Sequence, residues 1–504
     1  MKKLGILVIV LSVCFIFLHA AVVTAAEKGT LVFAQGGEIR SMDPALHASR
    51  MDSNYSYAVF NQLFNLDTEG GIIPVLATSY NRINDNTWEF ALRKGVRFHN
   101  GDPFTAADVK FSLERLLDPK MKHRMAIFYK SFKSVDIIDD YSIRIVTNNP
   151  DPLMIKRLAW TAWILPSKYI KEKGTEYFRK SPVGTGPFRF VEWIHNDRLV
   201  LELNQDYWSK APGIKKLIIR PIPEIGTAVA ELEAGGVDII TNVPPFLVNR
   251  LKSKKGVSIQ SVPGRSMSLY INTLKPGPLQ DKKVRQALNY AVDKQAIIDK
   301  ILMGSGILNA TNLTSYLFGY DPDLKPYPYD PEKAKQLLKE AGHPNLKLSF
   351  DSPSGRYLLD KQVSEVISGM FDKVGIQTTF NTHEWGKYVK IIIGKKLGGV
   401  GFIGWGNQFY DADGTLTPWF TNPKVPFCYY TDDVFQRDVA KARHSMDPDE
   451  RLAIYKRLNK HLKEVAPLVF LYQQIEHYGV SDRVKGWKAR GDEFVRFFGE
   501  VSVD

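Results

Sequence analysis

The chain has 504 residues, of which 44% are hydrophobic and 12% aromatic, which excludes a disordered protein and allows one large core or several ordinary ones. Its formal net charge is +13, or +11 without Lys2 and Lys3, but the basic residues are scattered and indicate no nucleic-acid-binding face. Of the two cysteines, Cys14 and Cys428, only Cys428 lies in the body of the chain, so no internal disulfide is expected there.

The N-terminus is typical of a secretory signal peptide. Lys2 and Lys3 precede an apolar run over residues 4–18, and the small residues AAVVTAA follow before Glu27. Residues 4–26 are also long enough to span a membrane, but no basic stop-transfer run follows them. The sequence therefore predicts a signal peptide over residues 1–26 and a periplasmic protein, with a membrane-tethered form as the less favoured alternative.

Beyond the signal peptide, predicted strands and helices are interleaved along the whole chain. In chain order, the sequence predicts strands at 30–35 and 87–93, a helix at 105–118, strands at 142–147, 199–204, 216–222 and 267–272, helices at 284–304 and 330–342, a strand at 400–403, and a helix at 448–465.

The ends of the predicted helices carry capping residues. Thr105 with Asp108 forms a capping box, Asp330 with Pro331 suits a helix start, and Asp447 precedes the last helix. Helices and strands mixed in this way favour an α/β or α+β architecture. No repeat or low-complexity linker divides the chain, so lobes that share segments are expected rather than separate domains in a row.

The stretch GGVGFIGWGNQFYDADG, residues 398–414, contains the G-x-G-x-x-G spacing of a dinucleotide-binding loop. Such a loop needs a helix that begins at its last glycine, whereas Gly404 is followed by turn-forming and aromatic residues. We expect instead an apolar strand from Val400 to Ile403 that ends in glycines beside Trp405. The tryptophan then either packs in the core or offers a flat face to a ligand.

Several segments in the same order resemble the extracytoplasmic solute-binding proteins of the peptide/nickel/opine class, which serve ABC importers. They are EIRSMDPALHAS, then the long stretch from NLDTEGG to LERLLDP, VGTGPFRFVEW with NQDYW, VRQALNYAVDKQAII and YDPEKAKQLLKEAG. The resemblance extends over nearly the whole chain after residue 26.

This resemblance implies an α/β fold of the periplasmic-binding-protein type, in which two lobes close over a ligand like a hinged trap, with an additional domain inserted near the N-terminus. Lobe I is expected to comprise residues 27–52, 182–264 and 477–504, the inserted domain residues 53–181, and lobe II residues 265–476.

The resemblance also implies ligand-binding positions. The loop with Glu38 matches a cleft-lining strand, Trp385 and Trp405 match two aromatic positions that flank the pocket, and Tyr472 lies at a crossover between lobes. Glu38 as a surface carboxylate and Trp385 as a core residue are the alternatives. The expected ligand-binding residues are Gly37, Glu38, Ile39, Trp385, Phe402, Trp405, Gly406, Gln408, Asp411, Tyr472 and Gln474.

Two positions depart from the peptide-binding pattern. Gln408 stands where peptide binders have an aspartate that pairs with the α-amine, and Phe402 stands where an arginine helps to hold longer peptides. A neutral amide cannot supply the charge-assisted bond of a buried ammonium. Asp411 and Asp413 could compensate, or they could be ordinary turn residues. The hypothesis is a pocket that favours stacking, as suits sugars, opines or modified peptides.

The predicted function is capture of a small or peptide-like solute by a monomer that delivers it to a cognate ABC permease in the inner membrane. The chain lacks the nucleotide-binding pattern G-x-x-x-x-G-K-[ST] and the nucleophile pattern G-x-S-x-G, and His383-Glu384 is followed by Lys387 where a zinc protease needs histidine. We therefore expect no enzyme, no cofactor, no metal and no nucleic-acid partner. A nickel or haem carrier on the same fold is the alternative, and a secreted hydrolase is less favoured.

Overall fold

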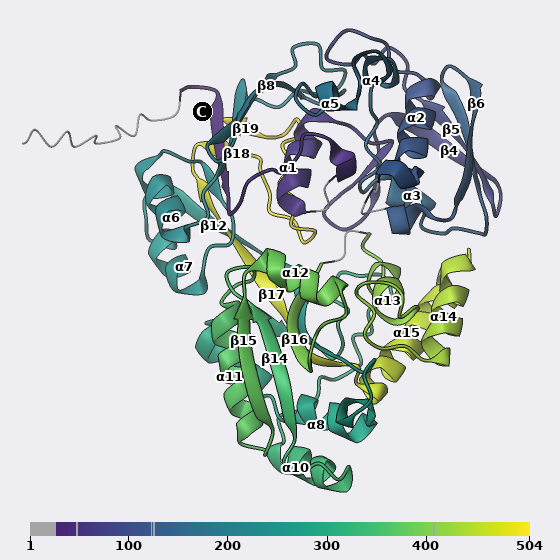
Figure 1. Cartoon of the computed structure of the whole chain (residues 1–504). Helices are drawn as coiled ribbons and strands as arrows, with labels where there is room; N and C mark the ends of the chain where they lie inside the picture. Colours follow the sequence, from purple (N-terminus) through teal and green to yellow (C-terminus); the bar gives the residue numbers. More distant parts are fainter. Residues whose placement is uncertain (1–26, 47–48, 122, 124–125, 407–408) are drawn as a thin grey trace, which may run out of the picture.

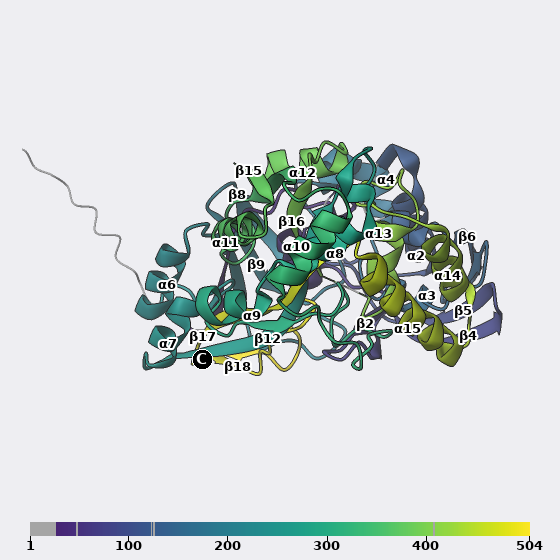
Figure 2. The ribbon, with the colours of Figure 1, turned by 90° about the horizontal axis from the view of Figure 1, so that it is seen from below.

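The computed structural model describes residues 27–46, 49–121, 123, 126–406 and 409–504 (Figure 1). Two lobes lie one above the other in Figure 1, and two long strands, β12 (Val257–Ile271) and β17 (Leu468–Ser481), run from one into the other. Seen from below, α6 and α7 lie at one end of the molecule and α14 and α15 at the other, with β12 and β17 between them (Figure 2).

One mixed sheet passes through both lobes, in the order β15-β14-β16-β12-β17-β11-β1-β10-β9-β8, and β13 pairs with β17. β12 and β17 are antiparallel, with partners from Val257↔Ser481 to Tyr270↔Leu468, so that they connect the lobes as a pair. The other strands of this sheet are β1 (Thr30–Gln35), β8 (Phe188–Ile194), β9 (Arg198–Leu203), β10 (Lys216–Pro221), β11 (Ile239–Ile240), β13 (Gly306–Leu308), β14 (Lys347–Pro353), β15 (Gln377–His383) and β16 (Val400–Trp405).

The core of lobe I joins segments that are far apart in the sequence. Phe33 of β1 and Leu217 of β10 pack in one buried cluster with Phe494 and Phe497 of the C-terminal tail. Further elements of this lobe are a 3-10 turn at Pro44–Leu46, α1 (Arg50–Val59), α6 (Ile225–Ala234), α7 (Pro245–Lys252), β18 (Val484–Lys485) and β19 (Ser502–Val503).

The inserted domain has its own sheet and core. Its four strands pair in the order β4-β5-β7-β6, and Phe90, Ile145 and Leu113 belong to a separate buried cluster. Its elements are β2 (Phe64–Leu66), β3 (Ile72–Pro74), β4 (Ala77–Asn84), β5 (Thr87–Leu92), α2 (Ala106–Leu117), 3-10 turns at Pro119–Met121 and Ala126–Tyr129, β6 (Phe132–Asp139), β7 (Ser142–Thr147), α3 (Met154–Leu158), α4 (Ser167–Lys173) and α5 (Thr175–Phe178).

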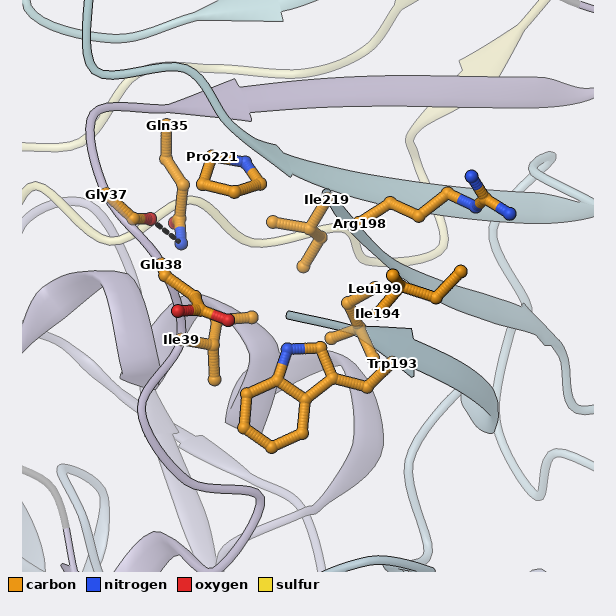
Figure 3. Close-up of a pocket in the computed structure, with 10 residues that line it drawn as sticks. All are labelled: Gln35, Gly37, Glu38, Ile39, Trp193, Ile194, Arg198, Leu199, Ile219 and Pro221. Atoms are coloured by element: carbon orange, nitrogen blue, oxygen red, sulfur yellow. Dashed lines mark hydrogen bonds between the residues drawn. The ribbon is translucent and has the colours of Figure 1, made fainter. Parts of the chain in front are cut away.

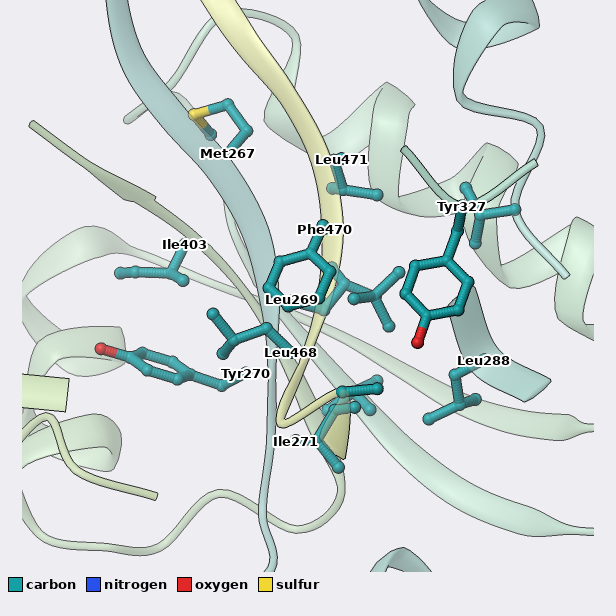
Figure 4. Packing of buried hydrophobic residues seen from close by; sticks show 14 of the residues in the cluster. Met267, Leu269, Tyr270, Ile271, Leu288, Tyr327, Ile403, Leu468, Phe470 and Leu471 are labelled. Carbon is teal, nitrogen blue, oxygen red and sulfur yellow. The ribbon is translucent and has the colours of Figure 1, made fainter. Parts of the chain in front are cut away.

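The core of lobe II forms around the far halves of the two connecting strands. Side chains of β12 such as Leu269 meet Leu468 and Phe470 of β17, with Leu288 and Ile403 beside them (Figure 4). The helices and helical turns of lobe II are a 3-10 turn at Pro278–Gln280, α8 (Lys282–Tyr290), α9 (Lys294–Ala296), a π-helical turn at Ile297–Ile301, α10 (Pro331–Glu340), α11 (Asp360–Asp372), α12 (Trp385–Ile393), α13 (Asp413–Phe420), α14 (Asp433–His444) and α15 (Pro448–Val465).

Most of the expected elements are confirmed, and one is not. The predicted capping box of Thr105 and Asp108 is present in α2, and Asp447 accepts hydrogen bonds from Asp449 N and Glu450 N at the start of α15. The expected continuous helix over 284–304 is instead broken after α8. Asp293 accepts a hydrogen bond from Ala296 N at 2.9 Å and so begins a new helix.

The G-x-G-x-x-G segment is a strand and not a dinucleotide-binding loop. Gly401 and Gly404 both lie inside β16 and pair with Tyr270 and Met267 of β12. A Cβ at Gly401 would lie 2.7 Å from the hydroxyl of Tyr388, which donates a hydrogen bond to the Phe402 carbonyl at 2.8 Å. Glycine is needed here because another side chain lies against the strand. Within the described parts of the chain, no helix is long and apolar enough to cross a membrane.

Candidate functional site

Charged side chains from both lobes meet where the two connecting strands pass between the lobes. Arg50 begins α1 of lobe I, Arg265 lies on β12, and Glu493 belongs to the C-terminal tail. The Glu493 carboxylate forms ion pairs with Arg50 and with Arg265, and Glu476 of β17 lies 3.4 Å from Arg265 Nε. The side chains of Arg265, Glu476 and Glu493 are at most 8% exposed, so this network is buried.

A third arginine belongs to lobe II and has no carboxylate partner. Arg356 lies over the rings of Tyr357 and Trp385, 5.0 and 5.1 Å from their centres, and forms no ion pair or side-chain hydrogen bond with the described residues. Its loop is fixed by Asp360, which accepts hydrogen bonds from the backbone N–H groups of Arg356 and Tyr357 at 2.8 and 2.9 Å. Arg356 is therefore a positioned but unpaired cation.

The arginines lie close enough to repel one another. Burial, followed by repulsion from the neighbouring Arg265, lowers the pKa of Arg50 to about 9. Burial, again followed by repulsion from Arg265, lowers the pKa of Arg356 to about 10. Both guanidinium groups stay charged at neutral pH, and each is destabilised by the other positive charges, so an anion between the lobes would relieve that repulsion.

Two tryptophans flank the arginines. Trp385 begins α12 and meets Tyr357 edge to face, with ring centres 5.8 Å apart. Trp405 ends β16, donates a hydrogen bond from Nε1 to the Gly414 carbonyl at 3.1 Å, and packs against Trp419 and other aromatic rings. Both indoles are partly exposed, so each is held in place while part of its surface stays accessible.

Glycines let the arginines approach β16. A Cβ at Gly404 would lie 2.7 Å from Arg265 Cδ and from Met267 Sδ, and a Cβ at Gly406 would collide with the guanidinium of Arg50. Because real Cβ atoms do not approach other atoms so closely, glycine at these positions is a condition for the arginine arrangement.

Several buried polar atoms around the network have no partner in the described protein. They include the hydroxyl of Tyr472, Oε1 of Gln474 and both polar atoms of the Asn312 side chain. The other amide atom of Gln474, Nε2, donates a hydrogen bond to Glu476 at 2.8 Å. Buried polar groups are normally paired with protein, water or a ligand, so this region is suited to polar contents.

The loop after β1, which contains Glu38, forms its hydrogen bonds with other residues of lobe I. The Glu38 carboxylate accepts hydrogen bonds from His195 Nδ1 and Asn196 N, both at 2.9 Å. Figure 3 shows Glu38 beside the Trp193 indole in a pocket whose cavity volume of about 10 Å³ suits a single water. Gly37 accepts a hydrogen bond from Gln35 at 3.1 Å, and Ile39 lies in the core of lobe I.

Two of the expected ligand contacts are instead structural. Phe402 is fully buried in the core of lobe II, because its side chain points to the side of β16 that packs on Tyr357. Asp411 is buried and accepts hydrogen bonds from Arg451 at 2.8 and 3.0 Å and from the Tyr455 hydroxyl at 3.1 Å. Gln408, which stands at the position where an aspartate is expected in peptide binders, lies outside the described residues.

Sequence reasoning did not single out Arg50, Arg265, Arg356 or Glu493. These residues are separated by up to several hundred positions, and basic residues are common throughout this chain. The one local signal was glycine: Gly404 and Gly406 are places where another side chain had to come close. Which side chain this is depends on the tertiary fold.

Comparison with known proteins gives consistent matches. The sequence model of the bacterial extracellular solute-binding proteins, family 5 Middle, matches residues 71–427. Heme-binding protein A of Haemophilus influenzae is 29% identical over 95% of this chain and 93% of its own length.

Two solved structures are similar over almost their whole length. The periplasmic binding protein DppA of Helicobacter pylori in complex with the peptide STSA has a TM-score of 0.85 at 29% identity, covering 94% of this chain and 98% of its own. NikZ of Campylobacter jejuni in complex with Ni(L-His) has a TM-score of 0.85 at 28% identity, covering 95% of this chain and 100% of its own.

Proposed function

Because this chain belongs to the bacterial extracellular solute-binding proteins of family 5, we propose that it captures a small organic anion between its lobes, with Arg356 as the anchor of the anionic group. The protein is the substrate-binding component of an ABC importer, as its relatives are. The unpaired guanidinium of Arg356 is the observation that carries the choice of solute.

The relatives alone do not select a solute. At nearly equal similarity, one is named for haem, one was solved with a peptide and one with a nickel–histidine complex. The choice must therefore come from the side chains of this site. One arginine without a carboxylate partner among the described residues favours a carboxylate or a comparable anion, because charge-assisted hydrogen bonds to guanidinium are strong and can be bidentate.

The aromatic side chains give the solute a second type of contact. Trp385 and Trp405 are held in place and partly exposed, so a planar or apolar portion of the solute can lie against them. This revises the hypothesis of stacking in place of ion pairing. In the proposed site, stacking at the tryptophans accompanies ion pairing at Arg356.

Closure follows from the distribution of these groups over both lobes. Arg356 and the tryptophans belong to lobe II, whereas Arg50 and the Glu38 loop belong to lobe I. A solute that contacts both lobes stabilises the closed form by its difference in affinity between the open and closed states. We propose the segments 27–52, 182–264 and 477–504 for lobe I, 53–181 for the inserted domain and 265–476 for lobe II. Helix α1 crosses the first of these boundaries, since its Tyr55 and Val59 pack in the lobe I core.

The closed, loaded form would then deliver its solute to a cognate permease in the inner membrane. We propose a periplasmic monomer, released by cleavage of a signal peptide over residues 1–26. This places capture and delivery on the outer side of that membrane.

The proposal is tested by solute capture. Protein unfolded and refolded without ligand is incubated with a small-molecule extract of its host, and native mass spectrometry identifies any solute that it retains. A stoichiometric organic anion is expected, and retention of only neutral solutes would contradict the proposal. Haem or a nickel chelate would identify the carrier alternative.

The role of Arg356 is tested on the captured solute by isothermal titration. Removal of one partner of a buried charge pair typically costs enough to weaken binding about 30-fold or more, so Arg356→Gln is expected to lose at least that. Arg250→Gln is the matched control, because Arg250 is exposed and pairs with Glu233 on lobe I. Equal affinity of the wild type and Arg356→Gln would refute the assigned anchor.

A further inference from the structure

We infer that the solute has no free ammonium group, so that the protein takes organic acids whose amino groups are absent or acylated and discriminates against ordinary zwitterionic peptides. This inference rests on the proposed function and adds the exclusion of one chemical class. It follows from the carboxylates around the site, each of which already has a cation or a hydrogen-bond donor of the protein as a partner.

The three carboxylates that the sequence offered to an ammonium all have protein partners. Glu38 is held by His195 and Asn196 in lobe I. Asp411 pairs with Arg451 at 2.8 Å, and Asp413 lies 3.2 Å from Arg157. A solute ammonium would have to displace one of these partners and leave it unpaired.

The carboxylates that border the arginine network are engaged as well. Glu493 pairs with Arg50 and Arg265 through Oε2, and Glu476 lies 3.4 Å from Arg265. Oε1 of Glu493 has no hydrogen-bond partner among the described residues, but the charge of this carboxylate is already matched by two arginines, which would repel an ammonium placed beside it. The next carboxylate along the tail, Asp492, pairs with Arg490 at 2.7 Å and with Arg496 at 2.9 Å.

Carboxylates near Arg356 are no more available. Asp360 accepts hydrogen bonds from the N–H groups of Gly355, Arg356 and Tyr357, and Asp351 accepts one from His383 Nε2 at 2.8 Å. Glu384 caps α12 through Gly386 N and Lys387 N.

The positions outside the described structure add no carboxylate to the body of the chain. Residues 47–48 are His and Ala, 122 is Lys, 124–125 are Arg and Met, and 407–408 are Asn and Gln. Aromatic rings could hold an ammonium in place of a carboxylate, but two of those beside the site already face guanidinium groups: Arg265 and Arg356 both lie over Tyr357, and Arg356 lies over Trp385. The third ring, Trp405, packs against Trp419 and Phe427.

An ammonium in this site would therefore meet cations. Arg265 lowers the pKa of both Arg50 and Arg356, and Arg356 also lowers that of Arg50, so a further positive charge beside them would be repelled. An anion is favoured by the same charges. The selectivity thus has an attractive part, at Arg356, and a repulsive part that acts against the ammonium of a peptide.

Matched probes test the inference directly. Refolded protein is incubated with an equimolar mixture of free dipeptides and the N-acetyl derivatives of the same dipeptides, and native mass spectrometry shows which masses are retained. In parallel, the solute captured from the host extract is released and treated with fluorescamine, which labels primary amines. We expect acetylated masses only, with at least a tenfold preference, and a captured solute that is not labelled.

The outcomes are separable from those of the proposed function. A captured anion that reacts with fluorescamine, or retention of free dipeptides, would overturn this inference and leave the capture of an anion standing. A captured, unlabelled anion supports it even if no dipeptide derivative binds. Capture of no solute at all would overturn both.

Discussion

At the scale of single residues, the site depends on two glycines, which have no side chain, as much as on its charged residues. Gly406 leaves the space that the Arg50 guanidinium fills, and Gly404 leaves space for the stem of Arg265. The arginines of the network are thereby brought to the end of β16, next to Trp405. The residues at positions 404 and 406 therefore determine where the arginine side chains can lie.

Gly406→Ala is expected to weaken solute binding about tenfold or more, because the new methyl group must displace Arg50. The measurement is isothermal titration with the captured solute. Gly226→Ala is the matched control, since a Cβ there meets open space. Unchanged affinity in Gly406→Ala would show that the position of Arg50 is irrelevant to binding.

Phe402→Ala is expected to lower the free energy of unfolding by about 3 to 5 kcal/mol, the usual cost of emptying a buried phenylalanine site. Urea denaturation measures this. Phe402→Leu should restore much of the stability and bind the solute as the wild type does, because the side chain lies in the core. A loss of binding in Phe402→Leu at retained stability would return Phe402 to the ligand site.

Single residues also show what can and cannot be predicted from the sequence. Trp405 could be placed at the end of a strand, because apolar residues and glycines precede it. Asp411 could not be assigned, since its partner Arg451 lies 40 positions away on α15. The same holds for Arg356: its lack of a partner is a property of the whole fold, and no local pattern reveals it.

At the scale of elements, hydrogen bonds fix how the inserted domain joins lobe I. His99 Nδ1 accepts a hydrogen bond from Gly184 N at 3.2 Å, and Nε2 donates to the Gly186 carbonyl at 2.9 Å. An N–H can only donate, so Nδ1 must be unprotonated, and the neutral ring is required. Burial accordingly lowers the pKa of His99 to about 4.

This junction predicts a pH dependence. Because the folded pKa of about 4 lies below the ordinary value of 6.5, the unfolded chain binds a proton between these values that the folded chain does not. Stability contributed by His99 is therefore present above about pH 6.5 and is lost as the pH falls toward 4. Urea denaturation at pH 7 and pH 4.5 should show a smaller difference for His99→Gln than for the wild type, and an equal difference would contradict the assignment.

Local signals sufficed for elements whose ends are capped. The bounds of α15 and of the strands β1 and β7 agree with the sequence, because caps, proline and alternation act over a few residues. The break after α8 was missed, although Asp293 is itself a capping residue. Apolar residues continue with helical spacing on both sides of it, and the pattern alone does not show which of two competing signals prevails.

At the scale of the whole molecule, the lobes also touch outside the proposed solute site. Arg157 of the inserted domain and Asp413 of lobe II form a buried pair at 3.2 Å, and Arg443 Nε lies 3.3 Å from Asp413. Lys156 donates a hydrogen bond to the Tyr410 carbonyl at 3.2 Å. Although burial favours the neutral acid, Arg443 and Arg157 outweigh it and hold the pKa of Asp413 below its usual range.

Asp413→Asn is expected to destabilise the closed form, since it removes one of the two carboxylates that pair with the buried Arg157, the other being Asp151. Small-angle X-ray scattering of the solute-free protein should give a larger radius of gyration for this variant, and titration should give weaker binding, because fewer molecules are in the closed form. Asp433→Asn, on the exposed first turn of α14, is the control. Identical scattering curves would mean that this contact persists in the open form.

The long antiparallel pair of β12 and β17 has a consequence for how the protein is made. β11 of lobe I pairs with both β1 and β17, and Phe494 and Phe497 complete the lobe I core. Strand β1 therefore cannot complete its packing until the C-terminal segment is present. A nascent chain that lacks its final 40 or so residues cannot finish lobe I. The topology that joins the lobes thus also delays the folding of lobe I until translation is nearly complete.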